Sequence, residues 1–244
     1  MFLIDTVLVF PSVKVVTSPE PLGTSTGQSV LHLFCRANNL CDRESISRAV
    51  ATGTSDLALQ IVPVAIVGAK ADICFMALGA DMWALRKFQT LIQASGLDVV
   101  ESYVSVTEIS EYAAGMPEKM LNDRLNPQLP PSGLRAFCFY PMSKRRGEVN
   151  NWFALAYEDR LRLMHQHGAS GRNFRGRILQ VVTGSTGLDD WEWGVTLFGA
   201  HLDDLKECVY TMRYDEASTL YGEFGPFYTG LVGSLDEVLD STLF

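Results

Sequence analysis

The chain has 244 residues, of which 47% are hydrophobic and 20% charged, and its formal net charge is −8. Such a chain buries a sizeable core as one large or two small domains, and its hydrophobic content excludes a disordered protein. The acidic balance argues against a nucleic-acid partner, because proteins of that class carry a basic surface. No uncharged apolar run approaches the roughly 18 residues that span a bilayer. The apolar first ten residues contain Asp5 and lack the basic start of a signal peptide.

The cysteines and histidines match none of the common metal-site motifs. The five cysteines are an odd number with no Cys-x-x-Cys pair, which favours reduced thiols in a cytoplasmic protein over a disulfide framework. The four histidines form no His-Glu-x-x-His sequence, and the chain has no Gly-x-x-x-x-Gly-Lys-Ser/Thr motif. Zincin and phosphate-loop functions are therefore excluded.

Hydrophobic patterns predict six elements in the first half of the chain. Asp42 and Asp81 stand where the N-caps of two helices are expected. The elements are a strand at 29–35, a helix at 43–60, strands at 62–67 and 71–78, a helix at 81–94 and a strand at 99–106.

The second half repeats the same order of elements. Gly168 is expected to end its first helix, since glycine commonly follows a helix C-terminus. Trp191, Trp193, Val195 and Leu197 are expected to share one face of a strand. The elements are a strand at 136–140, a helix at 152–166, strands at 178–183 and 191–198 joined by a turn at 184–190, a helix at 201–218 and a strand at 226–232.

Each half is therefore a β-α-β-β-α-β unit, the ferredoxin-like repeat. A sheet with both helices on one face leaves its other face apolar, so two halves can cover their sheets against each other. The sequence predicts an α+β fold of two fused ferredoxin-like repeats. The expected divisions are an N-terminal extension at 1–26, a first half at 27–112, an ordered connecting loop at 113–134 that holds four of the ten prolines, and a second half at 135–244.

Groups that could carry chemistry are concentrated in the second half. The segment 140–146 runs from Tyr140 through Ser143 and Lys144 to two arginines. A hydroxyl beside several cations suits an anionic ligand such as a carboxylate or a phosphate. The alternative is a solvated basic turn after the strand, because clustered charges mostly stay in water.

Two histidines lie close together near the predicted helix end. His167 shares a helical face with Arg160 and Met164, whereas His165 lies on a different face. The two histidines are therefore not expected to hold one metal together. A packed or exposed histidine is one interpretation of His167. The other is the axial ligand of a haem-type cofactor, whose macrocycle supplies the remaining donors.

Several motifs in a fixed order carry a resemblance to one family. They include FYPMSKRR at 139–146, HGASGR at 167–172, GLDDWEWGV at 187–195 and MRYDEAS at 212–218. In these motifs the chain closely resembles the coproheme decarboxylases, the peroxide-dependent branch of the chlorite dismutase-like haem proteins. The resemblance is close over 115–233 and holds only in outline over 27–114, and residues 1–26 are not covered.

The resemblance implies a dimeric α+β barrel, usually assembled as a homopentamer, whose second half binds iron coproporphyrin III (coproheme). With hydrogen peroxide as co-substrate, the family oxidises two propionates of coproheme to vinyl groups and releases haem b. We therefore expect an enzyme of haem synthesis that is cytoplasmic and makes transient contact with ferrochelatase.

The resemblance also implies roles for individual residues. His167 is similar to the proximal iron ligand, and Tyr140 to the tyrosine that is oxidised and then takes hydrogen from a propionate. Lys144 is expected to bind a propionate and to assist the second decarboxylation. The other expected substrate contacts are Arg124, Pro141, Met142, Ser143, Gln180, Arg213 and Ser218.

Gln180 separates this expectation from its nearest rival. Chlorite dismutases are expected to carry an arginine at this position, and actinobacterial decarboxylases a histidine between Tyr112 and Tyr140, where this chain has none. Two alternatives stay open: a haem-binding or haem-trafficking protein without redox chemistry, and a chlorite dismutase. Tyr140 disfavours the haem-binding or haem-trafficking protein, and Gln180 disfavours the chlorite dismutase.

Overall fold

The computed structural model describes residues 19–243, and within this range the first half has the predicted β-α-β-β-α-β order. The Asp42 carboxylate caps the first helix by accepting from the Ser45 amide at 3.0 Å. That helix ends before residue 60 because Ala58, with a φ of 52°, turns the chain toward the next strand. The elements are β1 (Ser29–Arg36), α1 (Arg43–Ser55), β2 (Gln60–Val67), β3 (Ile73–Gly79), α2 (Met82–Ala94) and β4 (Asp98–Thr107).

The second half keeps the predicted order and adds short elements to it. The predicted connecting loop contains a helix, and a further helix follows the last strand, where a Ser234–Glu237 capping box marks its start. The elements are α3 (Glu118–Leu125), β5 (Ala136–Lys144), a 3-10 helix (Trp152–Ala154), α4 (Tyr157–Arg172), β6 (Ile178–Gly184), β7 (Trp193–Gly199), α5 (Leu202–Met212), α6 (Glu216–Thr219), β8 (Gly222–Phe224), β9 (Tyr228–Val232) and α7 (Leu235–Thr242).

The prediction that Gly168 ends its helix is wrong. Helix α4 continues to Arg172, and the left-handed turn comes later, at Gly176 with a φ of 84°. Glycine within a helix costs some stability but does not stop it. His167 therefore projects from the body of α4 and not from its end.

The helix predicted at 201–218 is also broken. Helix α5 ends at Met212, and α6 starts after Asp215. The Asp215 carbonyl accepts from the amides of Ser218 and Thr219 at 2.9 and 2.8 Å, so the chain begins a new helical turn there. This break frees the Asp215 side chain to point elsewhere.

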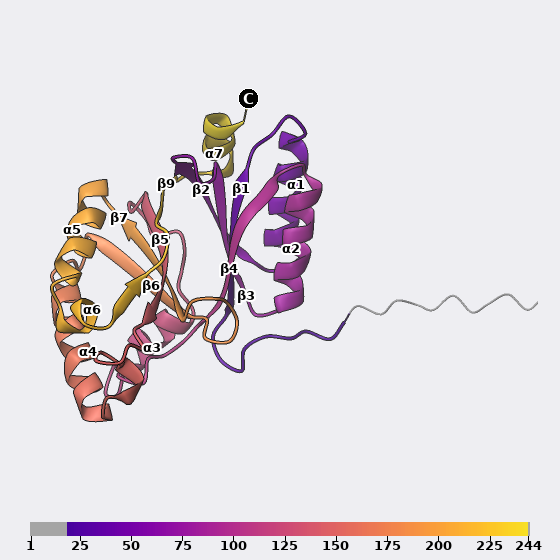
Figure 1. The fold of residues 1–244 in the computed structure, drawn as a ribbon. Coiled ribbons are helices and arrows are strands. Elements are labelled where there is room, and N and C mark those ends of the chain that lie inside the picture. Colours follow the sequence, from indigo (N-terminus) through magenta and orange to yellow (C-terminus); the bar gives the residue numbers. More distant parts are fainter. Residues whose placement is uncertain (1–18, 244) are drawn as a thin grey trace, which may run out of the picture.

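Eight strands close into a barrel (Figure 1). The sheet order is β7-β6-β4-β1-β3-β2-β9-β5-β8, and a further antiparallel pairing of β7 with β5 closes the ring, with the short β8 added beside β5. The two repeats meet through β4 with β6 and through β2 with β9. Side chains from both repeats fill the interior, among them Val30, Phe34, Val64, Met76, Tyr103, Phe137, Phe139, Phe198 and Tyr228.

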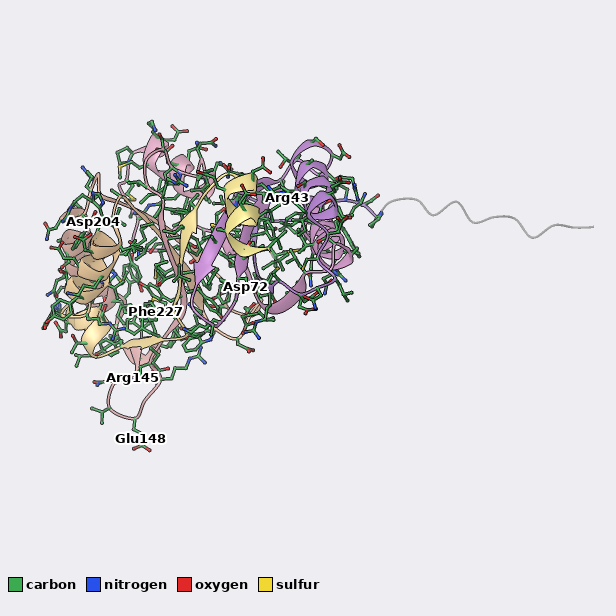
Figure 2. The ribbon with its side chains drawn as sticks, turned by 90° about the horizontal axis from the view of Figure 1, so that it is seen from above. Arg43, Asp72, Arg145, Glu148, Asp204 and Phe227 are labelled. Carbon is green, nitrogen blue, oxygen red and sulfur yellow. The ribbon has the colours of Figure 1, made fainter. Side chains whose placement is uncertain are left out.

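The helices cover the outer faces of the barrel. Helices α1 and α2 pack on the first repeat over a core that includes Leu33, Phe75 and Phe88. Helices α4 and α5 lie on the opposite side of the barrel (Figure 1). Figure 2 likewise shows Arg43 of α1 and Asp204 of α5 on opposite sides of the molecule. Within residues 19–243, no helix is both long and apolar enough to cross a membrane.

Two glycines offer a test of the revised end of α4. A Cβ added at Gly168 would meet only Arg172 Nη1 at 3.9 Å, and one at Gly176 would meet nothing within 4 Å. Both positions therefore have room for a methyl group, and they differ only in backbone conformation. We expect Gly168→Ala to raise the free energy of unfolding by about 0.5–1 kcal/mol. Gly176→Ala should lower it by about 1–2 kcal/mol, because φ is positive there.

Urea denaturation of both variants and of the unsubstituted chain measures these changes. A loss of stability in Gly168→Ala as large as that in Gly176→Ala would show that α4 does not continue through residue 168.

Candidate functional site

A cavity of about 1460 Å³ lies between the outer face of the second-half strands and the helices that cover them. It is larger than the roughly 300–1,000 Å³ of common small-molecule pockets, so it has room for a macrocycle. Eight of the ten predicted site residues line it: Arg124, Tyr140, Met142, Lys144, His167, Gln180, Arg213 and Ser218.

Strand β5 explains why Pro141 and Ser143 are not among them. The strand does not end at Tyr140, as predicted, but runs on to Lys144. Alternate residues of a strand face opposite sides, so Tyr140, Met142 and Lys144 face the cavity together. Pro141 and Ser143 face the other way, and the Ser143 hydroxyl accepts from the Glu192 amide at 3.2 Å. Substrate binding by Pro141 and Ser143 stays a prediction.

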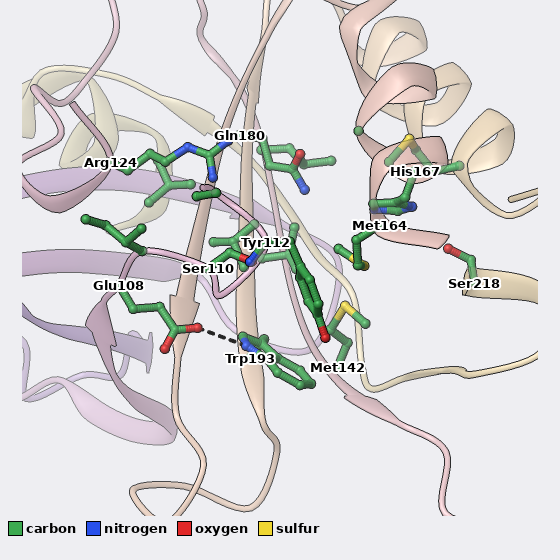
Figure 3. A pocket seen from close by; sticks show the side chains of 18 of the residues that line it. Glu108, Ser110, Tyr112, Arg124, Met142, Met164, His167, Gln180, Trp193 and Ser218 are labelled. Atoms are coloured by element: carbon green, nitrogen blue, oxygen red, sulfur yellow. Dashed lines mark hydrogen bonds between the residues drawn. The ribbon is translucent and has the colours of Figure 1, made fainter. Parts of the chain in front are cut away.

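His167 projects from α4 toward the cavity, with Gln180 on a strand across from it (Figure 3). Its Nδ1 donates to the buried Asp215 carboxylate at 3.1 Å, and the Ser170 hydroxyl donates to the other carboxylate oxygen at 2.6 Å. In the part of the chain that the structure describes, Nε2 is therefore the ring nitrogen without a hydrogen bond. A histidine whose second nitrogen is held by a carboxylate is the usual form of a metal-binding imidazole.

The charge state of His167 also suits a metal ligand. Burial lowers the pKa of the imidazole, the nearby Lys144 lowers it further, and Asp215 opposes both effects. The neutral ring is therefore favoured near neutral pH, with a lone pair on Nε2 for a metal. Within residues 19–243, no cluster of three or more His, Cys, Asp or Glu side chains could hold a metal ion. A single neutral imidazole held by a carboxylate suits an iron whose other donors come from a macrocycle.

His165 is exposed and also borders the cavity. The helical spacing predicted that only one histidine of the pair would point at a given ligand, and this stays a prediction, since His165 borders the cavity from a different face of α4. It makes no hydrogen bond through its ring within the described residues, in contrast to His167.

Lys144 is buried, with 8% of its surface exposed. Its Nζ donates to the Ala217 carbonyl at 3.0 Å and lies 4.4 Å from the centre of the Trp152 ring. Burial lowers the pKa of this amine to about 8, and Glu192 opposes the change. The Glu192 carboxylate also accepts from the Lys144 amide at 2.8 Å and pairs with Arg146, which fixes this end of β5.

Tyr140 lies in an aromatic setting beside one cation. Its ring stacks on Phe227 at 4.5 Å between centroids and meets Phe224 edge-on at 5.9 Å. Burial raises the pKa of the phenol, and Arg213 opposes this in part. The Arg213 guanidinium lies 4.9 Å from the Phe224 ring centre and has no ion pair within the described residues. A neutral phenol and a free guanidinium therefore stand together at one side of the cavity.

The rim of the cavity is positive although the chain is acidic. Four arginines that line the cavity have no carboxylate partner in the part of the chain that the structure describes: Arg124, Arg172, Arg175 and Arg213. Unpaired guanidinium groups attract anions and bind carboxylates with two parallel hydrogen bonds. The cavity thus suits an apolar macrocycle that carries several carboxylates.

The segment between β4 and α3 forms another wall, and the sequence did not predict it. Glu108 accepts from Trp193 Nε1 at 3.0 Å (Figure 3), and the Tyr112 hydroxyl accepts from Arg160 Nε at 3.0 Å. Trp193 therefore lines the cavity. Trp191 precedes β7 and packs against the barrel interior, so the prediction that the two indoles share a face is wrong.

Comparisons with known proteins agree with this geometry. The chlorite dismutase family model matches residues 43–233. A solved structure from Thermus thermophilus, described as a novel heme-binding protein, is 32% identical, with a TM-score of 0.77 over 90% of this chain and 96% of that one. Chlorite dismutase from Candidatus Nitrospira defluvii, in complex with imidazole, is 21% identical and similar in fold, with a TM-score of 0.70 over 89% of this chain and 95% of that one.

These matches confirm the fold of two ferredoxin-like repeats and the family resemblance that the motifs predicted. The chain belongs to the chlorite dismutase family.

Proposed function

We propose that the chain is a coproheme decarboxylase. The reaction oxidises two propionates of coproheme to vinyl groups, with hydrogen peroxide as the oxidant, and gives haem b. For each propionate, one carboxylate, one peroxide and one proton yield a vinyl group, carbon dioxide and two water molecules. The observation that carries the proposal is that a buried phenol, Tyr140, and a carboxylate-held imidazole, His167, line the same macrocycle-sized cavity.

Substrate binding follows from the walls of the cavity. His167 Nε2 would hold the iron that coproheme brings, and the iron supplies the redox chemistry with peroxide. The apolar lining suits the faces of the macrocycle, and the unpaired arginines suit its carboxylates. Arg124, Gln180 and Ser218 would complete the contacts, as the family resemblance implies.

Tyr140 would remove hydrogen from the reacting propionate. The phenol is kept neutral by burial, so it carries the hydrogen that it must lose when it is oxidised. The Arg213 guanidinium beside it would hold the carboxylate, which places the propionate chain against the phenol. Orientation of this kind is a large part of catalysis in a confined site.

Lys144 would bind a second propionate from the same strand face, on which Met142 separates it from Tyr140. Its ammonium has a carbonyl and an aromatic ring as partners and, among the described residues, no carboxylate in direct contact, so it retains attraction for an anion. A pKa near 8 also lets it give up or take a proton at modest cost.

Gln180 favours the decarboxylase over a chlorite dismutase. Its amide is neutral, whereas splitting chlorite needs a cation to hold the developing oxyanion. The description of the Thermus protein as heme-binding supports the third candidate, a haem-binding protein without this chemistry. Release of carbon dioxide when peroxide is added would distinguish the decarboxylase from a haem-binding protein. Release of oxygen from chlorite would favour the dismutase.

Other parts of the proposal rest on the family resemblance. They are the division of labour between a non-haem first half at 27–112 and a haem-binding second half at 135–244, the homopentamer, contact with ferrochelatase and a cytoplasmic location. The second-half origin of most cavity residues supports the first of these.

The decisive experiment follows coproheme by mass spectrometry while peroxide is added. The chain should convert it through a three-propionate intermediate to haem b. Tyr140→Phe should bind coproheme and lose conversion by at least about a hundredfold, because the oxidisable phenol is gone. Tyr112→Phe, which removes another phenol that lines the cavity, should still convert it. Conversion by Tyr140→Phe at the rate of the unsubstituted chain would remove the role of that tyrosine.

A second prediction concerns the two histidines of α4. His167→Ala should change the absorption spectrum of the iron-porphyrin complex, because the axial nitrogen is lost. His165→Ala is the matched control and should leave the spectrum unchanged. If the spectrum changes only in His165→Ala, the iron ligand has been assigned to the wrong residue.

A third prediction follows from the lowered pKa of Lys144. As pH rises through about 8, the amine becomes neutral and its attraction for a carboxylate is lost. Coproporphyrin affinity should therefore fall about tenfold between about pH 7 and about pH 10. Lys144→Met should have a lower coproporphyrin affinity at pH about 7, and its affinity should change less with pH. Lys206→Met, outside this cavity, should keep the profile of the unsubstituted chain, and a steep profile in Lys144→Met would contradict the role of this lysine.

A further inference from the structure

Methionine is concentrated around the cavity. The chain has eight methionines, and five of them line it: Met116, Met120, Met142, Met164 and Met212. They come from four separate parts of the chain, namely α3 with the segment just before it, β5, α4 and the end of α5. Four parts that are distant in sequence therefore bring thioethers to one cavity.

These methionines are open to small molecules. Met120 is 39% exposed, and the other four are half-buried. Two further methionines of the described range lie elsewhere: Met76 is fully buried in the barrel, and Met82 is half-buried against the core of the first repeat. The chain thus contains an inaccessible methionine and an accessible one outside the cavity, both useful as references.

Two of the thioethers share an element with the proposed iron ligand or with the proposed reactive side chains. Met164 stands one helical turn before His167 on α4, and Met142 stands between Tyr140 and Lys144 on β5. Figure 3 shows the Met142 and Met164 sulfur atoms in the part of the cavity between Trp193 and His167. Met212 lies against α4, since a Cβ at Gly171 would be 4.0 Å from its sulfur.

We propose that this methionine lining is an oxidative modification site that controls porphyrin binding. Hydrogen peroxide transfers one oxygen atom to a thioether: the O–O bond breaks, an S–O bond forms, sulfur is oxidised, peroxide is reduced and water leaves. The proposal rests on the proposed function, in which peroxide is the co-substrate and a porphyrin the ligand of this cavity.

The modification changes what the cavity can hold. A thioether is apolar and flexible, which suits the face of a macrocycle. A sulfoxide is polar, and burying its oxygen against an apolar ring without a hydrogen-bond donor is unfavourable. Excess peroxide would therefore lower porphyrin affinity stepwise as sulfoxides accumulate. Methionine sulfoxide reductases reverse the change, so the loss is temporary.

Metal-free coproporphyrin III is the probe for the test, because it has the macrocycle and carboxylates of the proposed substrate and, without iron, cannot be decarboxylated by peroxide. The full chain is treated with hydrogen peroxide, the excess is removed with catalase, and sulfoxides are mapped by peptide mass spectrometry. We expect oxidation at the cavity methionines and at Met82, and none at Met76. The porphyrin Kd should rise at least about tenfold and recover after treatment with sulfoxide reductases A and B.

Two variants show which methionines are responsible. A chain with all five cavity methionines changed to Leu removes the sulfur at similar side-chain size. The measured quantity is the ratio of Kd after and before peroxide, so a change in starting affinity cancels. This ratio should be near one in the five-Leu chain, whereas Met82→Leu should respond like the unsubstituted chain. If circular dichroism shows that the five-Leu chain is unfolded, the single variants Met142→Leu and Met164→Leu replace it, each with a smaller ratio expected.

Three outcomes would overturn the proposal: no sulfoxide at the cavity methionines, sulfoxides there without loss of affinity, or an equal loss in the Leu variants. Failure of the proposed function gives a different result, since untreated protein would then not bind coproporphyrin III at all.

Discussion

The two-residue alternation of β5 is the constraint on which the cavity depends. This strand pairs with β7 on one side and with β9 and β8 on the other, so its register is held from both edges. Phe137 and Phe139 fill the barrel, and Tyr140, Met142 and Lys144 face the cavity. A slip of one residue would exchange the two sets. The register of β5 therefore both closes the barrel and determines which side chains face the cavity.

The opposite wall is organised by two hydrogen bonds from α4 to one buried carboxylate. Asp215 stands in the break between α5 and α6, and its carboxylate holds His167 and Ser170 of α4. The two walls are also linked by charge, because Lys144 of β5 lowers the pKa of His167 while Asp215 raises it. Burial is the main cause of the lowered pKa of His167, so the ring is neutral, and the two charged neighbours act on it in opposite directions.

Hydrophobic patterns predicted the repeated order of strands and helices, and therefore the fold. The two-residue period of a strand and the 3.6-residue period of a helix can each be recognised within a short stretch of sequence. Asp42 was correctly predicted as a helix cap for the same reason. Helix α3 was missed because the prolines on both sides of it suggested a loop and none of its side chains is buried. The error at Gly168 arose because sequence alone does not distinguish a helical glycine from a left-handed one.

The candidate site was predictable only where a family motif named the residue. Eight of the ten predicted residues meet in one cavity, yet the strand alternation that turns Pro141 and Ser143 away depends on where β5 ends. Asp215 lay within a quoted motif, but its contact with His167 joins residues 48 apart. Such a pairing, like the arginines that line the rim, follows from tertiary structure and leaves no local pattern.

The most direct test of the proposed site is an experimentally determined structure of the chain with iron coproporphyrin III. The iron should lie on Nε2 of His167, with one propionate carboxylate beside Arg213 and its carbon chain against the Tyr140 phenol. A macrocycle bound outside this cavity, or an iron held by a residue other than His167, would contradict it.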